Sequence, residues 1–322
     1  MDALEAIRAA VRDRQVVMVN EEHRYPAHRA FVHLMLPHLW DLGFRYLAVE
    51  ALDDADQDIH ARGYPTRRSG SYIGDPVFAD LLRTALQLGF TLVPYEAAEP
   101  CQPDPGNPMS CQDARELGQA RNLIARTLEQ DPRARILVHV GRGHNAKVET
   151  EQLSMMAAHF RRLSGIDPLT IDQLESRKAD PADESPLYRH VTSRWPFQQP
   201  VVLRRSDGRS LEKDGYDLVV FHPRAGLVDG RSDWLRMNGY RRPHAIDAVA
   251  LGLPLRDGVL AVPSPVLIQA LRPSEGEDAV PVDQIMVRPG EAVPSLLLPT
   301  GVHVIRAVDR DGRSLGLYEI VL

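Results

Sequence analysis

Several short apolar runs in this chain are each followed, within a few residues, by a Glu or a His. The runs occupy residues 16–19, 46–49, 92–95, 136–140 and 218–221, and the polar residues that follow them are Glu21, Glu50, Glu96, His144 and His222. Apolar runs of about four to eight residues, separated by helical patterns, are typical of buried parallel strands. In an open α/β sheet, ligands bind beyond the carboxyl ends of such strands. The sequence therefore predicts one shared site at that edge of the sheet.

Residues 1–242 alternate these runs with helical patterns. This alternation predicts an α/β fold with a parallel-rich sheet flanked by helices. Pro37 lies inside the second helical pattern and is expected to kink or divide it. We expect helices over residues 1–14, 26–41, 76–88, about 110–130 and about 147–164, and further extended segments at 169–171, 200–203 and 216–222.

Residues 243–322 lose the helical periodicity and instead alternate short Val/Leu runs with Pro/Gly turns. Such a pattern is typical of a small β-sandwich. Asp311-Gly312 marks a hairpin turn near the end. We therefore expect two domains, the α/β domain over residues 1–242 and a small all-β accessory domain over 243–322. Its strands are predicted at 259–262, 266–270, 285–287, 295–298, 303–307 and 316–321.

The composition argues against two classes of partner. The 322-residue chain is 43% hydrophobic and 25% charged, which is typical of a globular protein with a real core. Its net charge of −6 argues against nucleic acid, because that binding depends on clustered Lys and Arg. No apolar run reaches the roughly 18 residues of a membrane span. We expect a small-molecule partner, and the oligomeric state stays open.

The N-terminus and the two cysteines bear on the compartment. The first residues form an amphipathic helical pattern without the features of a signal peptide, which predicts a cytoplasmic protein, or a periplasmic one if the N-terminus has been trimmed. Cys101 and Cys111 flank a Pro/Gly/Asn loop. A disulfide between them would fit an exported protein and two free thiols a cytoplasmic one, and both alternatives stay open.

The first predicted strand-to-helix turn contains Glu21, Glu22 and His23, with His28 five residues further on. A carboxylate beside an imidazole makes a general-base pair, because the carboxylate fixes the tautomer of the ring. The same residue types also ligate divalent metals. The turn is therefore the first candidate for acid–base or ligand chemistry.

Glu50 and Glu96 each end an apolar run, where an unpaired carboxylate would be costly. Arg115, in a predicted helix, and Arg142, in a Gly-Arg-Gly-His turn, are available cations. Asn122 lies on the same helix face as Arg115.

Two tyrosines complete the set of candidates. Tyr72 lies in a polar insertion over residues 53–75, which we interpret as a lid or substrate loop, with disorder as the alternative. Tyr95 directly precedes Glu96 at the end of an apolar run.

The sequence lacks the motifs of several other mechanisms. Gly141-Arg142-Gly143-His144 does not have the spacing of a dinucleotide-binding fingerprint, and no P-loop or GxSxG elbow is present. Neither cysteine has the neighbours that activate a thiolate. The nucleophile that this layout supplies is water, activated by His, carboxylate or metal.

Four segments resemble, in the same order, the motifs of the erythromycin esterase / ChaN / Tiki-like superfamily. They are V-N-E-E-H-R-Y-P-A-H-R-A-F at 19–31, F-R-Y-L-A-V-E at 44–50, R-E-L-G-Q-A-R-N-L at 115–123 and R-I-L-V-H-V-G-R-G-H at 135–144. The resemblance covers about residues 15–240. Two departures are that Asn20 replaces the family's Gly, and that the Glu-to-His spacing is the two of ChaN-type haem-binding proteins. His222 has the weakest motif match.

The resemblance implies roles for individual residues. Glu21 and His23 would be the acid–base pair, with His23 activating water, and Glu50 the second catalytic carboxylate. Arg115 would be an oxyanion or carboxylate partner, and His144 the late histidine of the family. We add Glu96 to the catalytic candidates, and the candidates for substrate binding are Glu22, His28, Tyr72, Tyr95, Asn122 and Arg142.

From these roles we expect an esterase-type hydrolase that requires no cofactor. Three alternatives stay open. The chain could be a ChaN-like haem or iron carrier with His23, His28 or His144 as ligand. It could be a Tiki-like hydrolase that uses a divalent metal. It could also be a degenerate member whose site holds polar residues without turnover.

Overall fold

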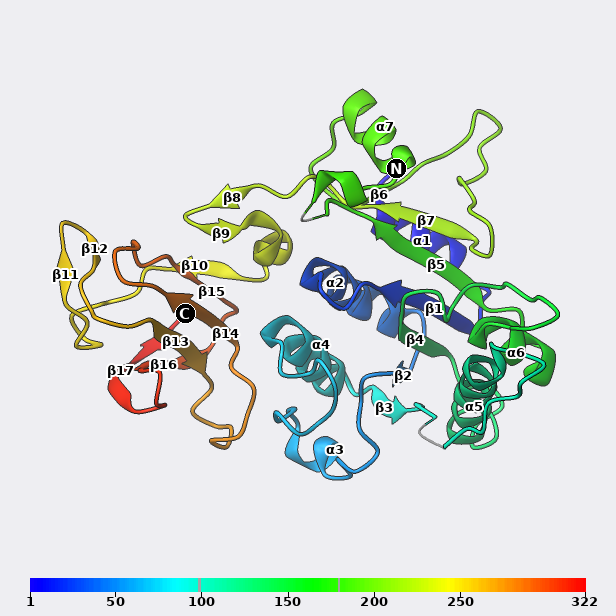
Figure 1. Ribbon diagram of the computed structural model, residues 1–322, viewed down its shortest axis with the longest axis horizontal. Helices are drawn as coiled ribbons and strands as arrows, with labels where there is room; N and C mark the ends of the chain where they lie inside the picture. The colour runs from blue at the N-terminus through cyan, green and yellow to red at the C-terminus, as the bar shows by residue number, and fades with distance from the viewer. Residues whose placement is uncertain (98–99, 179) are drawn as a thin grey trace.

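The computed structural model describes residues 1–97, 100–178 and 180–322, and its centre is a seven-stranded sheet (Figure 1). The strand order is β3-β2-β4-β1-β5-β7-β6, and neighbouring strands are parallel except that β6 pairs antiparallel with β7. The predicted α/β fold class is confirmed. The strands are β1 (Val16–Glu21), β2 (Tyr46–Val49), β3 (Thr91–Pro94), β4 (Ile136–Gly141), β5 (Leu169–Glu175), β6 (Val201–Val202) and β7 (Leu218–Phe221).

Helices cover both faces of this sheet. In β1, Val17 and Val19 belong to a core shared with α1, α2 and α4, whereas Val16 and Met18 belong to a core shared with α5 and α6. Both faces of the central strands are therefore buried, which is why their sequences are continuously apolar. These helices are α1 (Ala3–Ala10), α2 (Pro26–Asp41), α4 (Pro76–Leu88), α5 (Ser110–Arg126) and α6 (Met156–Ser164). None of the helices in the described ranges is long and apolar enough to cross a membrane.

Some helices differ from the prediction. Pro37 does not divide α2, because the proline is exposed while Leu36 and Leu39 anchor the helix in the core. α6 begins only at Met156, since a turn closed by hydrogen bonds between Thr150 and Leu153 precedes it. The shorter elements α3 (Ile59–Arg62), α7 (Pro186–Arg194), η1 (Pro181–Asp183) and η2 (Asp233–Gly239) were not predicted.

The C-terminal segment forms an antiparallel sheet of order β14-β13-β16-β17. Ile268 and Ile305 of this sheet share a core with Leu296 and Leu298 of β15. The hairpin turn at Gly312 is present, with a φ of 80° that favours glycine. The division after residue 242 stays a prediction. The strands of this part are β8 (Leu227–Val228), β9 (Arg231–Ser232), β10 (Arg242–His244), β11 (Leu255–Arg256), β12 (Val259–Leu260), β13 (Val266–Leu271), β14 (Asp283–Val287), β15 (Leu296–Leu298), β16 (Val302–Val308) and β17 (Ser314–Val321).

Buried ion pairs fasten α4 to the segments that follow the sheet. Arg241 Nη2 donates to Asp80 Oδ2 at 2.9 Å, and both side chains are completely buried. Arg83 Nε donates to Glu275 Oε1 at 2.8 Å. Because an uncompensated buried charge is strongly destabilising, neither partner of such a pair can be lost cheaply.

Cys101 and Cys111 form a disulfide with a Cα–Cα distance of 5.5 Å. Of the two redox states left open by the sequence, the structure shows the disulfide, and the compartment stays a prediction. Cys111 lies in the first turn of α5, so the bond ties the segment after β3 to the start of that helix.

The buried Arg241–Asp80 pair generates a stability prediction. The substitution Asp80→Asn leaves the Arg241 guanidinium buried without its counter-charge. The free energy of unfolding should therefore fall by about 3–5 kcal/mol. The matched control is Glu291→Gln, which removes the exposed Arg288–Glu291 pair and should leave the free energy of unfolding nearly unchanged. Urea denaturation followed by circular dichroism measures both, and equal effects would contradict the inference.

Candidate functional site

Four predicted site residues meet at one guanidinium. Arg115, on α5, donates from Nη2 to Glu50 Oε1 at 2.8 Å and to Glu96 Oε2 at 2.5 Å. Its Nη1 lies 3.2 Å from His144 Nε2. Glu50, Glu96 and His144 follow β2, β3 and β4, so the parallel strands deliver them to one edge of the sheet, as predicted. Their catalytic roles stay predictions.

A fifth member, Glu116, completes what we call the Arg115 group: Glu50, Glu96, Arg115, Glu116 and His144. The Glu116 side chain is completely buried, and its Oε1 lies 2.7 Å from His144 Nδ1. Burial by itself would lower the pKa of His144, but the contact with Glu116 and the charge of Glu50 outweigh it and raise that pKa above its ordinary 6.5. The site therefore favours the protonated form of His144.

A second cluster, the Glu21 group, consists of Glu21, His23, Arg29 and His139. Arg29 binds Glu21 with both ends of its guanidinium, at 2.6 Å from Nε and 2.8 Å from Nη2. Burial would raise the pKa of Glu21, but His139, His23 and Arg29 together bring it far below its usual range, so Glu21 stays ionised. His23 Nδ1 lies 2.7 Å from Glu21 Oε1. This contact keeps the His23 proton on Nδ1 and makes Nε2 the proton acceptor.

Gly141, the last residue of β4, separates the two groups. A Cβ added there would lie 2.9 Å from His23 Nε2 and 3.0 Å from Glu50 Oε2. The backbone N–H of Gly141 also donates to Glu50 Oε2. His23 and Glu50 therefore face each other across a backbone that has no side chain, and only glycine leaves that space open.

The insertion over residues 53–75 reaches over this site. Tyr72 stacks on the His23 ring, with centroids 4.3 Å apart and planes 12° apart. Its φ of 62° is unusual for a bulky residue and indicates that the surrounding loop holds it. Asp75, at the end of the insertion, caps α4 and lies 3.8 Å from Arg29. The insertion is ordered over the site, and its role as a lid or substrate loop stays a prediction.

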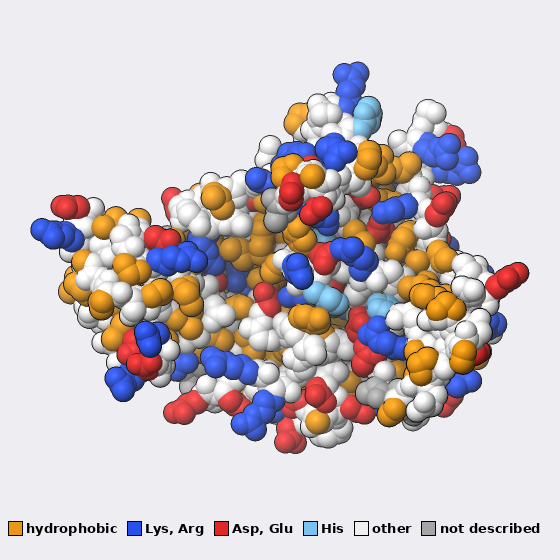
Figure 2. Space-filling view, in the orientation of Figure 1, with side chains coloured by type: hydrophobic (Ala, Val, Ile, Leu, Met, Phe, Trp, Pro, Cys, Tyr) orange, Lys and Arg blue, Asp and Glu red, His pale blue; other side chains and the backbone are white. Residues whose placement is uncertain are grey.

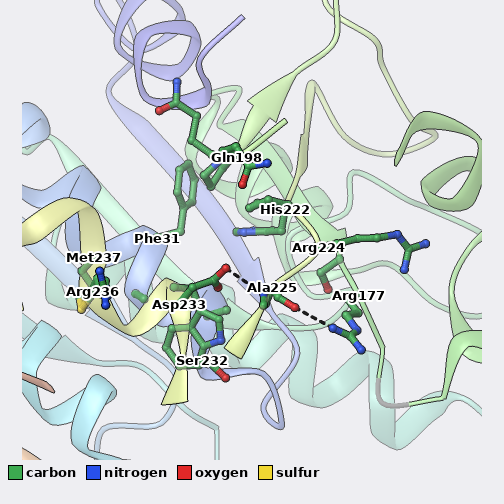
Figure 3. Close-up of a pocket in the computed structure, with 18 of the residues that line it drawn as sticks. Phe31, Arg177, Gln198, His222, Arg224, Ala225, Ser232, Asp233, Arg236 and Met237 are labelled. Carbon is green, nitrogen blue, oxygen red and sulfur yellow. Dashed lines mark hydrogen bonds between the residues drawn. The ribbon is translucent and has the colours of Figure 1, made fainter. Parts of the chain in front are cut away.

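Charged and His side chains come to the surface near the middle of the face shown in Figure 2. We call the sheet edge that carries the Arg115 group and the Glu21 group the acid–base edge. Beside this edge lies a cavity of about 690 Å³, drawn in Figure 3. Its described lining comes from residues around the start of α2, from the segments after β5 and before β6, and from the chain that runs from His222 through η2. The Arg115 group and the Glu21 group do not contribute to that lining.

His28 and His222 belong to this cavity. The ring of His28 is buried, its Nδ1 accepts from the Glu22 N–H at 2.9 Å, and its Nε2 lies 3.2 Å from Ser176 Oγ. The His222 ring lies 5.1 Å from that of His28. His222, with the weakest motif match in the sequence, therefore lines the cavity together with a residue that we had assigned to substrate binding.

Two predicted substrate contacts have supporting positions instead. Tyr95 is completely buried and its hydroxyl donates to the carbonyl of His139 at 3.1 Å. Asn122 Nδ2 donates to the carbonyls of Tyr95 and Glu96, at 3.3 and 3.0 Å, and so fixes the turn after β3. Both side chains therefore donate hydrogen bonds to backbone carbonyls at the strand ends and stabilise the backbone that carries the site.

Glu22 and Arg142 form an ion pair at the rim of the site. Arg142 is the exposed partner of this pair, with a side chain that is 65% exposed, whereas the Glu22 side chain is mostly buried, with 16% exposed. Their predicted contact with substrate stays a prediction.

The sequence did not single out Glu116 or Arg29, and a signal for Glu116 was present. α5 carries a polar stripe at helical spacing, and its inward face packs on the sheet edge where an apolar stripe is usual. That stripe contains Gln112, Arg115, Glu116, Gln119 and Asn122, of which Gln119 Nε2 donates to Glu96 Oε1 at 3.1 Å. Arg29 lies on α2 among apolar neighbours. Because an unpaired guanidinium would be costly there, its position in the sequence indicates an acidic partner.

Comparison with known proteins finds likeness in structure alone. No protein-family model and no curated protein matches this chain significantly. The type III effector HopBA1 is 13% identical, with 69% of this chain and 93% of that chain covered and a TM-score of 0.40. ChaN of Campylobacter jejuni, a haem-binding structure, is 8% identical, with 68% and 91% covered and a TM-score of 0.38.

Toxin structures also match over part of their length. RRSP, a MARTX toxin effector domain from Vibrio vulnificus, is 13% identical, with 54% of this chain and 36% of that chain covered and a TM-score of 0.38. The first match, a bacterial protein toxin with a TM-score of 0.39, is covered over 37% of its length. The structural neighbours thus include toxin effectors and a haem-binding protein, and membership of the superfamily named above stays a prediction.

The close approach at Gly141 generates a prediction about the site. In Gly141→Ala the new methyl group would overlap His23 and Glu50, so the His23 ring should be displaced while the fold persists. The change should appear as a shift of the His23 ring resonances in NMR spectra. Gly74→Ala is the matched control, since a Cβ there meets nothing within 4 Å. Unchanged His23 resonances in Gly141→Ala would contradict the described geometry.

Proposed function

We propose that this chain is a hydrolase of ester bonds in which His23 is the general base and His144 the general acid. One observation carries this proposal: two imidazoles, each paired with its own buried carboxylate, lie on either side of Glu50. His144 Nε2 is 3.5 Å from Glu50 Oε1, and His23 Nε2 faces Glu50 Oε2 across Gly141. A hydrolytic step requires a general base and a general acid, and we assign these roles to His23 and His144.

The proposed step begins with His23 Nε2 removing a proton from a water molecule. The water oxygen then attacks the carbonyl carbon of the ester, and the electron pair of the C=O bond moves to the oxygen. Arg115 is the cation nearest to His144 and would stabilise this developing negative charge. The electron pair on the carbonyl oxygen then re-forms the C=O bond as the C–O bond to the alcohol breaks, and His144 donates its proton to the leaving oxygen. His23 afterwards releases its proton to solvent, and His144 takes one up from solvent. The products are a carboxylic acid and an alcohol.

The carboxylates divide into two functions in this scheme. Glu21, held ionised by Arg29, orients the base and stabilises the imidazolium that forms on His23. Glu116 holds the acid in its protonated form. Glu50 and Glu96 position Arg115 between them. Each of these groups acts through a contact of ordinary hydrogen-bond or ion-pair length.

The resemblance to ChaN and to Tiki-like proteins would imply haem or a divalent metal. Of the histidines proposed as ligands, His28 does not fit such a group, because both of its nitrogens have partners. His23 and His144 each contact a carboxylate through Nδ1, which is the usual second contact of a histidine that ligates through Nε2. No three His, Cys, Asp or Glu within the described ranges are arranged to hold a metal ion. The chemistry that we propose uses protein side chains, and the absence of a cofactor stays a prediction.

The carrier alternative has its own test. Titration with haemin should give no Soret band that depends on His23. A Soret band that disappears in His23→Ala would favour the haem carrier over the hydrolase. Stoichiometric zinc or manganese in the purified protein would favour the metal-dependent alternative.

The general-base role of His23 predicts the effect of its removal. His23→Gln should lower the kcat for a panel of p-nitrophenyl esters by about 10²–10⁴-fold, the usual contribution of a positioned acid or base. Glu50→Gln should also lower the kcat, because Arg115 loses one of the carboxylates that position it. His190→Gln is the control, because His190 is exposed on α7, outside the described site. If His23→Gln and Glu50→Gln both hydrolyse the panel like the original chain, the proposal fails.

The raised pKa of His144 predicts a pH dependence. His144 must be protonated to act as an acid, so kcat/KM should fall as the pH rises through that pKa, above 6.5. Glu116→Gln removes a charge that raises this pKa, so the alkaline limb of the profile should move to lower pH. Glu149→Gln, an exposed change, should leave the limb in place. If the alkaline limb does not move in Glu116→Gln, the limb reports a group other than His144, and the assignment of His144 as the acid is contradicted.

A further inference from the structure

The cavity beside the sheet edge that carries the Arg115 group and the Glu21 group has the size of a small-molecule site. Its volume of about 690 Å³ lies within the range of roughly 300–1,000 Å³ that such sites occupy. Its wall includes Tyr25, in the same β1–α2 connection as His23, and His28, in the first turn of α2. Figure 3 shows Phe31 and His222 on one side and Arg177, Arg224 and Ala225 on another, around a common space.

The charged side chains that line the cavity are mainly cationic. They are Arg177, Lys178, Arg224 and Arg236, and Asp233 is the one carboxylate among the described lining residues. The Asp233 carboxylate already accepts from the Gly226 N–H at 2.9 Å. Arg224 is neutralised by Glu184, at 3.0 and 2.7 Å. An excess of positive charge therefore remains at the mouth formed by residues 177 and 178.

Lys178 is the cation best placed to meet a ligand. Its ammonium group lies 4.6 Å from the centre of the Tyr25 ring and donates to Ser176 Oγ at 3.4 Å. Burial, and then the neighbouring Arg142, lower the pKa of Lys178. A negative charge beside this ammonium group would relieve both effects, because it would compensate the lost hydration and the repulsion.

The rest of the lining is apolar or uncharged. Phe31 meets the His222 ring edge to face at 5.5 Å. Burial lowers the pKa of His28 well below its usual value and that of His222 to about 3, so both rings are neutral at physiological pH. The two imidazoles therefore extend the aromatic wall and do not add to the positive charge. Leu34, Trp234 and Met237 close the cavity.

We propose that this cavity is a binding site for an organic anion that has one acidic group and an aromatic or branched apolar body. The acidic group pairs with Lys178 and with the guanidinium of Arg177, whose Nη1 donates to the Ala225 carbonyl at 2.7 Å. The apolar body lies between Phe31, Trp234 and the two histidines. This binding is independent of ester hydrolysis, and the cavity binds its ligand whether or not the acid–base edge is catalytic.

Two fluorescent probes test the proposal on the full chain. 8-Anilinonaphthalene-1-sulfonate has an aromatic body with a sulfonate, and N-phenyl-1-naphthylamine has the same body without the charge. We expect both to bind, the sulfonate more tightly. Lys178→Gln should raise the Kd of the sulfonate probe by about tenfold, equivalent to roughly 1.4 kcal/mol, and leave the Kd of the uncharged probe unchanged. Arg310→Gln, on the exposed β16–β17 turn, should change neither.

A blocking variant places the probes in the cavity. Ala27→Trp, at the half-buried start of α2, should fill the space and abolish binding of both probes. Ala225→Trp fills it from the opposite segment, and near-ultraviolet circular dichroism verifies that each variant is folded. The proposal is overturned if the folded blocked variants bind both probes as before. Equal effects of Lys178→Gln on the two probes would also overturn it.

Discussion

Carboxylates that meet at one edge of a parallel sheet repel one another, and the local structure depends on two arginines that offset this repulsion. Arg115 lies between Glu50 and Glu96, and Arg29 binds Glu21 from the neighbouring helix. Charge-assisted pairs of this geometry also fix orientation, because the guanidinium fork matches the carboxylate plane. The strand ends can therefore hold ionised groups a few ångströms apart without losing their shape.

Around this neutralised edge, the two histidines contact carboxylates in different surroundings. Glu21 has its charge shared among Arg29, His23 and His139, whereas Glu116 is directed at His144. The contact with Glu116 raises the pKa of His144, although burial alone would lower it. The cations that already contact each carboxylate therefore decide how much of its charge acts on the neighbouring imidazole.

The sequence predicted the strands and the strand-end residues well because both follow from local rules. Continuous apolar runs identify strands buried on two faces, and parallel pairing then brings Glu50, Glu96 and His144 to one edge. The same rules could not place Glu116. It lies next to Arg115 in the chain, but its carboxylate contacts His144. Nor could these rules predict the cavity, whose walls come from segments far apart in sequence. Local rules also could not show that Tyr95 and Asn122 bind backbone carbonyls at the strand ends, and their contact with substrate stays a prediction.

The disulfide has a consequence for how the site is assembled. It closes a loop between positions 101 and 111, a separation of 10 residues, between the strand end that carries Glu96 and the helix that carries Arg115. Closing a loop of this length restricts the unfolded chain by about 2–3 kcal/mol in the chain-entropy model. Part of the conformational entropy cost of bringing Glu96 and Arg115 together is thus met before folding begins. Reduction of the disulfide would therefore destabilise the arrangement of the acid–base edge, although it changes none of the side chains there.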